Sequence, residues 1–198
     1  MRLDGRRHLV ALLAMLLLTV SAAPADSRSA DDEAALWAAL RSGEAAALMR
    51  HALAPGTGDP AGLDIDDCGT QRNLSDRGRV QAAAIGQRWR ANGIASARVY
   101  SSRWCRCLET ARLLELGPVQ PFDGLNSFFR DRAAEPERSA AVLALIREQT
   151  RRGGPSLLLV THQVNITALS GVFPDSGETI VVRPNGTDLE LLGRIPMP

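Results

Sequence analysis

Two histidines, His51 and His162, each follow a stretch of sequence that predicts a buried strand. His51 comes at the end of the short apolar run 45–50, and His162 follows the continuous apolar run 156–160 and Thr161. A neutral imidazole is a nucleophile and a general base near neutral pH. Because ligands of open α/β sheets bind at the carboxyl ends of the strands, we expect both rings at one such edge. Each histidine taken alone is equally consistent with an ordinary polar residue at a strand end.

The basic residues are all arginines, 23 of them in a chain of 198 residues with a net charge of +1. The absence of lysine excludes Schiff-base chemistry and the lysine of a P-loop. The arginines form no basic block, and binding to a nucleic-acid backbone requires clustered cations. The composition is that of one soluble domain and gives no reason to expect nucleic acid as a partner.

Strands and helices alternate along the chain. This order predicts a three-layer α/β/α fold, with a mainly parallel central sheet and helices on both faces. The second helix begins after the N-cap Ser75, and Val80, Ile85 and Trp89 with two alanines form its predicted apolar face. The predicted helices are 31–41, 76–91, 103–115, 135–151 and 164–169; the predicted strands are 45–50, 97–100, 119–122, 156–160 and an edge hairpin of 179–182 and 188–192.

A long segment rich in Gly, Pro and Asp runs from the first strand to Asn73. Loops of more than about 12–15 residues in a compact domain are usually functional or disordered. We therefore interpret residues 54–72 as a candidate substrate flap, and we expect this flap to govern the choice of substrate.

Residues 1–25 have the three-part pattern of a secretory signal peptide: a basic start, the apolar stretch 9–20, and small residues at Ala23 and Ala25. Cleavage after Ala25 leaves a single domain, residues 26–198. The alternative is an uncleaved membrane anchor, but the apolar stretch is shorter than the ~20 residues that span a bilayer. We expect secretion across the inner membrane into the periplasm, with no stable membrane span after cleavage.

Export into an oxidising compartment would permit a disulfide among Cys68, Cys105 and Cys107. A bond within Cys105–Cys107 closes too tight a ring, so we expect Cys68 to pair with either Cys105 or Cys107. The alternative is three free thiols. These cysteines and the few histidines lack the paired spacing of a zinc site, and we predict no metal.

Four segments occur in the order, and near the spacing, of one known family. They are 48–52, 74–82, 102–111 and 160–162. Their specific parts are the Arg50-His51 pair, the Ser-x3-Arg-x3-Thr-Ala pattern that starts at Ser102, and Thr161-His162. The sequence resembles the histidine phosphatase superfamily, which has the phosphoglycerate mutase-like fold, and in particular the small single-domain members of its first branch. The resemblance covers residues 45–169.

The resemblance implies that His51 accepts a phosphoryl group and that water then hydrolyses the phosphohistidine. It implies that Arg50 and Arg106 clamp the phosphate, since a planar guanidinium engages two phosphate oxygens and stays charged. His162 would donate to the same oxygens. For Arg106 the alternative is a solvated charge on a helix, which is also our interpretation of the neighbouring Arg103. The implied partner is a small phosphorylated substrate, and no cofactor is implied.

The general acid of the family, a carboxylate from the middle of the chain, has no clear counterpart. Ser127 stands where a glutamate would be expected, and the nearby Asp131 is a candidate acid. A donor must lie within hydrogen-bond reach of the leaving group. The other candidates are loop residues that are equally well explained as solvated charges: Asp59, Asp64, Asp66 and Asp67. Either one of these carboxylates moves in, or the leaving group needs little protonation, as in phosphohistidine or an acyl phosphate.

The sequence thus predicts an exported, metal-independent phosphatase that hydrolyses a phosphomonoester through phospho-His51. A phosphosugar of the cell envelope is the substrate suggested by export and by analogy with secreted relatives. One alternative is a phosphohistidine or acyl-phosphate phosphatase. Another is a non-catalytic module that binds phosphorylated ligands on the same fold.

Overall fold

The computed structural model of the chain describes residues 25–196. The predicted signal peptide lies outside the described residues except for Ala25, the first residue of helix α1. Within 25–196, no helix is long and apolar enough to cross a bilayer.

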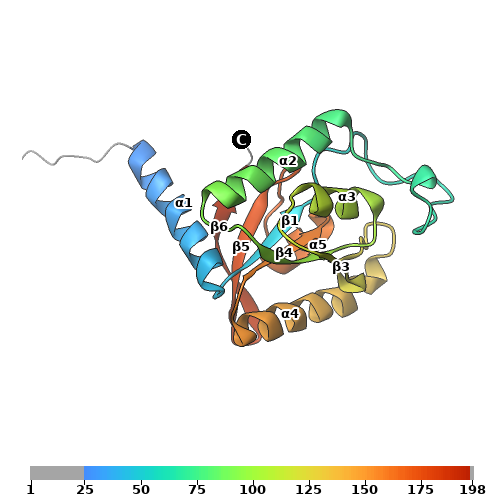
Figure 1. The fold of residues 1–198 in the computed structure, drawn as a ribbon. Coiled ribbons are helices and arrows are strands. Elements are labelled where there is room, and N and C mark those ends of the chain that lie inside the picture. Colours follow the sequence, from blue (N-terminus) through green and yellow to red (C-terminus); the bar gives the residue numbers. More distant parts are fainter. Residues whose placement is uncertain (1–24, 197–198) are drawn as a thin grey trace, which may run out of the picture.

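A six-stranded mixed sheet forms the centre of the molecule, in the order β3-β2-β4-β1-β5-β6 (Figure 1). The strands β3, β2, β4 and β1 pair in parallel, which confirms the mainly parallel sheet expected from the sequence. The hairpin β5–β6 joins β1 in antiparallel orientation, so that β6 forms one edge of the sheet and β3 forms the other. The bounds are β1 Ala46–Arg50, β2 Ala97–Ser101, β3 Val119–Pro121, β4 Ser156–Thr161, β5 Thr179–Asn185 and β6 Asp188–Ile195.

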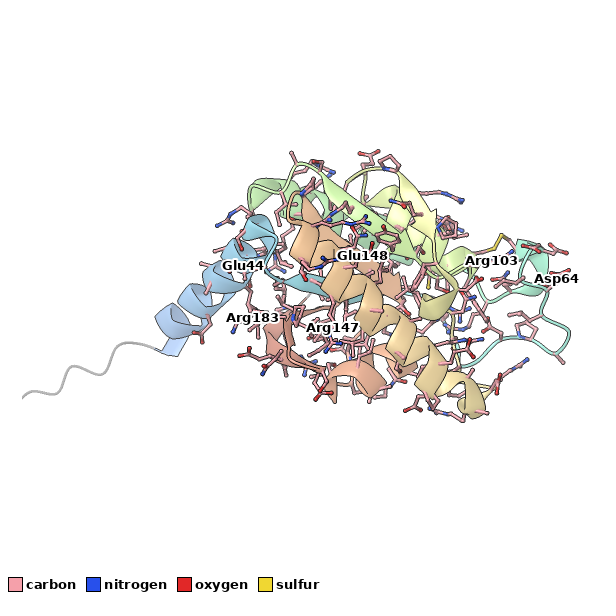
Figure 2. The ribbon with its side chains drawn as sticks, turned by 90° about the horizontal axis from the view of Figure 1, so that it is seen from below. Glu44, Asp64, Arg103, Arg147, Glu148 and Arg183 are labelled. Carbon is pink, nitrogen blue, oxygen red and sulfur yellow. A yellow bond between two sulfur atoms is a disulfide. The ribbon has the colours of Figure 1, made fainter. Side chains whose placement is uncertain are left out.

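Helices cover both faces of this sheet. On one face, α1 (Ala25–Ser42), α2 (Asp76–Ala91) and α3 (Cys105–Leu113) pack against alternate strand residues such as Met49 and Leu158. On the other face, α4 (Glu135–Arg152) and α5 (Gln163–Ser170) pack against the intervening residues such as Leu48 and Leu159. Figure 2 shows α4, with Arg147 and Glu148 labelled, crossing this second face. The three predicted layers are therefore present.

The central position of strand β4 explains why its sequence is almost entirely apolar. All six of its residues are buried, and the side chains of Leu157 and Leu159 enter one core while those of Leu158 and Val160 enter the other. A strand that is covered on both faces requires a continuous apolar run rather than an alternating one. The run therefore ends where the chain leaves the sheet, at Thr161 and His162.

Two predicted details differ from the structure. Helix α1 begins at Ala25 rather than at Asp31, because no Gly or Pro interrupts the intervening sequence. Val80 was predicted on the apolar face of α2, but it is 70% exposed. The buried face runs through Ala82, Ile85 and Trp89, and the helical repeat of 100° per residue turns Val80 to the opposite side.

Helix α2 approaches α3 closely at Gly86, where a Cβ atom would lie 2.1 Å from the carbonyl oxygen of Leu114. In an open helix, replacing Gly with Ala raises stability by about 1 kcal/mol. At Gly86 we expect the reverse, a loss of roughly 1–3 kcal/mol, because the added methyl group forces the helices apart. Chemical denaturation of Gly86→Ala tests this, with Ala83→Gly measuring the intrinsic propensity of the same helix. A stabilised Gly86→Ala variant would show that the helices separate without cost.

Candidate active site

The two histidines meet at the carboxyl edge of the sheet. Strands β1 and β4 are parallel neighbours with Arg50 opposite Thr161, so His51 and His162 leave the sheet side by side. Their ring centroids are 5.6 Å apart, and the residues are only 2% and 4% exposed. The backbone N–H of His51 donates to the carbonyl of Thr161 at 2.9 Å and fixes the first turn after the strand.

The hydrogen bonds of His51 define its tautomer. Nδ1 lies 2.7 Å from the carbonyl oxygen of Ala52. A carbonyl oxygen can only accept, so Nδ1 carries the proton and Nε2 keeps its lone pair. Nε2 accepts from the Nε–H of Arg106 at 3.3 Å. Burial, and then the charge of Arg106, hold the pKa of His51 well below its usual value. The ring is therefore neutral and has a nucleophilic nitrogen on the side of Arg106.

His162 has the opposite tautomer. Its Nδ1 accepts from Nη2 of Arg106 at 3.3 Å, so Nε2 carries the proton and donates to Oγ of Ser102 at 2.9 Å. The Ser102 hydroxyl in turn donates to Oδ1 of Asn126 at 3.2 Å. Burial, followed by the charge of Arg106, lowers the pKa of His162 well below its usual value. The sequence interpretation missed Asn126 because nothing in its spacing indicates that this loop returns to Ser102, directly after β2.

Arg106 lies at the centre of the site and is 2% exposed. The sequence also predicted Arg50, whose Nη1 donates to the carbonyl of Pro174 at 2.9 Å. Within the described part of the chain, the buried Nε of Arg50 has no hydrogen-bond partner. A third arginine, Arg72, was not predicted; it donates to the carbonyl oxygens of Gly58 (2.7 Å from Nε) and Ala54. Three guanidinium groups around two neutral imidazoles favour an anionic ligand.

These side chains line a cavity of about 220 Å³. Around its mouth lie apolar side chains, including Phe129 and Phe173, which are 45% and 64% exposed. Trp104 contributes an indole whose centroid lies 5.4 Å from that of His162, in an edge-to-face arrangement. Within residues 25–196, no group of three or more His, Cys, Asp or Glu side chains is arranged to hold a metal ion.

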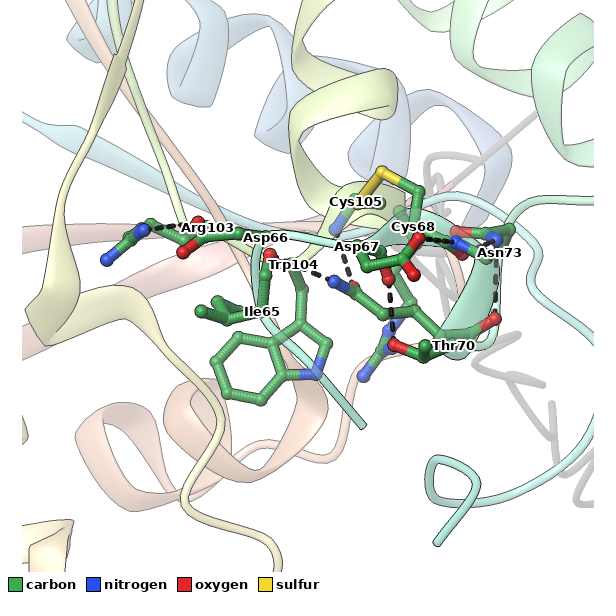
Figure 3. Close-up of a disulfide and its surroundings, with 12 residues drawn as sticks. Ile65, Asp66, Asp67, Cys68, Thr70, Asn73, Arg103, Trp104 and Cys105 are labelled. Atoms are coloured by element: carbon green, nitrogen blue, oxygen red, sulfur yellow. Dashed lines mark hydrogen bonds and ion pairs between the residues drawn. A yellow bond between two sulfur atoms is a disulfide. The ribbon is translucent and has the colours of Figure 1, made fainter. Parts of the chain in front are cut away.

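The flap, residues 54–72, forms one wall of the cavity through Asp59, Leu63 and Arg72 among others. A disulfide joins its Cys68 to Cys105, the first residue of α3, which confirms one of the two predicted pairings (Figure 3). Further contacts lie close by. The backbone N–H of Cys105 donates to Oε1 of Gln71 at 3.0 Å, and Arg103 pairs with Asp66 at 2.6 Å.

Cys107 is the free cysteine of the three. Its thiol is buried, with Sγ 3.5 Å from Nε2 of His162. Burial raises the pKa of Cys107 to about 12. The thiol is therefore protonated and unreactive at neutral pH.

The candidate general acids differ in their positions relative to the cavity. Asp131 is exposed before the short 3-10 helix Arg132–Ala134 and is not among the residues that line the cavity. In this arrangement Asp131 faces solvent and is not within reach of a leaving group bound in the cavity. Asp64, Asp66 and Asp67 form contacts within the flap or with Arg103.

Asp59 is the one carboxylate among the cavity-lining residues described. Its oxygens accept from Nη1 of Arg106 at 2.5 Å and from Nη2 at 3.1 Å. Its side chain is 10% exposed, so it is not the solvated charge that the sequence alone would suggest.

Comparison with known proteins finds one similar family and several similar folds. The sequence model described as histidine phosphatase superfamily (branch 1) matches residues 47–128, a range that includes Arg50, His51 and Arg106. No curated protein sequence matches the chain. Several solved structures share the fold, which is the phosphoglycerate mutase-like α/β fold.

One of these structures is the putative phosphohistidine phosphatase SixA from Agrobacterium tumefaciens, with 20% identity over 77% of this chain and 96% of that chain, and a TM-score of 0.52. A phosphoserine phosphatase from Entamoeba histolytica has 14% identity over 76% and 95% of the two chains, with a TM-score of 0.55. A mycobacterial glucosyl-3-phosphoglycerate phosphatase has 16% identity over 75% and 96%, with a TM-score of 0.55. The chain is thus similar to the histidine phosphatase superfamily, branch 1, over residues 47–128, and it shares the fold of these phosphatases.

The neutral, buried histidines predict a loss of stability in mild acid. The pKa values of His51 and His162 are lower in the folded than in the unfolded chain, where histidine titrates near 6.5. Their stabilising effect is therefore complete above pH 6.5 and is lost as the pH falls below it, because only the unfolded chain binds protons there. The free energy of unfolding should fall by about 1.4 kcal/mol per pH unit for each histidine.

Denaturation between pH 7 and pH 5 measures this slope. In a folded His162→Gln variant the slope should be halved. An unchanged slope in that variant would show that His162 is not buried as a neutral ring.

The Cys68–Cys105 disulfide closes a segment with a sequence separation of 37. From the loss of chain entropy in the unfolded state, we expect reduction to lower the free energy of unfolding by about 4 kcal/mol. Denaturation with and without reductant measures the difference. The double variant Cys68→Ser/Cys105→Ser is the control, because reductant should not destabilise it further. An equal effect of reductant on the variant would contradict the pairing.

Proposed function

We propose that the protein is a phosphatase that hydrolyses a phosphomonoester through a phosphohistidine on His51. The observation that supports this most directly is the unprotonated Nε2 of the buried His51, which faces the guanidinium of Arg106 at 3.3 Å. A nucleophile that is already neutral needs no base to activate it. The second imidazole, His162, lies beside it on the same guanidinium.

In the proposed reaction, the phosphate binds between Arg50, Arg106 and Arg72. The unpartnered Nε–H of Arg50 gives it one donor, and the guanidinium charges stabilise the negative oxygens as the phosphoryl group transfers. Nε2 of His51 forms the bond to phosphorus while the bond to the leaving oxygen breaks. Water then breaks the nitrogen–phosphorus bond and releases phosphate. A phosphate dianion beside His162 favours its protonated form, in which Nδ1–H donates to a phosphoryl oxygen.

We propose further that the protein is exported to the periplasm and acts there without a metal or other cofactor. The signal-like residues 1–25 support export, and the Cys68–Cys105 disulfide is of the kind that persists in oxidising compartments. A phosphorylated sugar of the cell envelope fits this location. Exposed Phe129 and Phe173 at the mouth of the cavity offer apolar faces to a sugar ring, and Arg130 also lines the cavity.

A second candidate substrate is a phosphohistidine or an acyl phosphate. It is favoured by the position of Asp59, whose carboxylate is bound to Arg106 as an anion and so has no proton to give in this arrangement. Phosphohistidine and acyl phosphates have leaving groups that need little protonation. The similar fold of a putative phosphohistidine phosphatase, SixA, agrees with this possibility.

Hydrolysis of p-nitrophenyl phosphate by oxidised residues 26–198 tests the proposed nucleophile. We expect turnover that persists in EDTA and is lost in His51→Ala, since the nitrophenolate leaves without an acid. His162→Ala should reduce the rate by roughly 10²–10³-fold through loss of a donor to the phosphoryl oxygens. Release of nitrophenol is followed by absorbance.

Two neighbouring arginines provide the matched control. Arg106→Ala should abolish turnover, whereas Arg103→Ala, which removes only the pair with Asp66, should leave it within about twofold. A folded protein that binds phosphate but turns over no faster than His51→Ala would indicate a binding module instead of an enzyme.

A further inference from the structure

The carboxylate of Asp59 occupies the part of Arg106 that a phosphate needs. Its two oxygens accept from Nη1 and Nη2 of Arg106, the paired donors of the guanidinium fork. Carboxylate and phosphate are alternative bidentate acceptors for this fork. The Nε–H of Arg106 is already directed to His51, and Nη2 also donates to His162. A phosphate that reaches His51 and binds both Nη atoms must therefore displace Asp59.

Displacement would not remove Asp59 from the cavity. One carboxylate oxygen accepts from the indole Nε1–H of Trp104 at 3.2 Å, and the other accepts from the backbone N–H of Arg72 at 3.3 Å. The main-chain carbonyl of Asp59 accepts from the Arg130 side chain. These contacts, together with the Cys68–Cys105 disulfide, keep the flap beside the site. A displaced Asp59 side chain thus stays within a side-chain rotation of the bound phosphate.

We propose that Asp59 is the proton donor to the leaving group, and that the substrate phosphate brings it into the donor state by taking its place on Arg106. This inference rests on the proposed phosphatase function and deepens it. Asp59 is suited to the role because it is the one carboxylate among the cavity-lining residues described.

The charges around Asp59 explain the change of state. Burial raises the pKa of Asp59, but the hydrogen bonds and the charge of Arg106 offset this and hold the pKa below its usual value. Once the phosphate takes Arg106, burial remains and a negative charge is added, and both favour the protonated carboxyl. The other ionisable groups that line the cavity are Arg50, Arg72, Arg130, His51 and His162. The arginines oppose protonation, but the phosphate that binds between them neutralises their charge.

The displaced Asp59 carboxylate first takes up a proton from bulk water, and the two chemical steps then balance. In the first step, the Asp59 carboxyl gives its proton to the leaving oxygen as the oxygen–phosphorus bond breaks and the bond from Nε2 of His51 to phosphorus forms. In the second step, the Asp59 carboxylate takes a proton from water as the water oxygen attacks phosphorus and the nitrogen–phosphorus bond breaks. Asp59 ends protonated; when inorganic phosphate leaves, Asp59 returns to Arg106 and releases this proton to bulk water.

A comparison of two aryl phosphates tests the proposal on the purified, disulfide-bonded protein. Phenyl phosphate and p-nitrophenyl phosphate are similar in shape, but phenolate needs protonation far more than nitrophenolate. We expect Asp59→Asn to lower kcat by roughly 100-fold on phenyl phosphate and by no more than about fivefold on p-nitrophenyl phosphate. Inorganic phosphate should also inhibit Asp59→Asn at a lower concentration than the wild type, since the neutral amide competes less well for Arg106.

Asp66→Asn is the matched control, because Asp66 is also a flap carboxylate bound to an arginine, Arg103, but does not line the cavity. Asp66→Asn should change neither kcat on the two aryl phosphates nor the phosphate concentration that inhibits. Equal losses of Asp59→Asn on both substrates, or unchanged inhibition by phosphate, would overturn the proposal and leave Asp59 a structural partner of Arg106. If Asp59→Asn does not fold, measurements of kcat on the wild-type protein test the proposal instead. With Asp59 as donor, kcat of the wild type on a series of phenyl phosphates depends only weakly on the leaving group; a steep dependence overturns the proposal.

The two proposals fail in different ways. If His51→Ala retains full activity on p-nitrophenyl phosphate, the phosphohistidine function fails. If His51→Ala is inactive while Asp59→Asn loses both substrates equally, only the assignment of Asp59 fails.

Discussion

The buried guanidinium of Arg106 is the constraint on which the rest of the site depends. A charge that is 2% exposed destabilises a fold unless it is paired and its donors are satisfied. Here Arg106 donates to both imidazoles and to Asp59. One group thereby contacts the unprotonated nitrogen of each histidine and a carboxylate of the flap. The position of the flap is a consequence of charge pairing as much as of packing.

The second constraint on the site is the register of strands β1 and β4 in the sheet. Because β1 and β4 are parallel neighbours with Arg50 opposite Thr161, the residues that follow them meet without a long connecting loop. The central position of β4 buries it on both sides, so the last residue of the strand is held rigidly. A polar residue placed directly after such a strand has its backbone position determined by the core. This arrangement places both imidazoles directly after strands that are buried in the core.

Sequence reasoning identified the parts of the site that belong to regular elements. The apolar runs before His51 and His162 carry enough information to place both at one edge, and Arg106 lies in a helix with a specific motif. Asp59 and Arg72 could not be singled out, because the flap has no periodicity and its path depends on distant partners such as Cys105. The position of Asp131 outside the cavity was unpredictable for the same reason: closeness in sequence to Ser127 does not decide which way an irregular segment turns. Val80 was misassigned because a valine in a helix can face solvent.

The disulfide joins the flap to the residue directly before Arg106. A newly synthesised, reduced chain holds the same wall by noncovalent contacts alone, such as those of Gln71, Arg103 and Asp59. The covalent bond therefore ties completion of the cavity to the redox state of the surroundings. In a protein that crosses a membrane before it is oxidised, the disulfide would close the flap wall only in the oxidising compartment. Phosphorylated metabolites in the compartment of synthesis would then not meet the completed cavity.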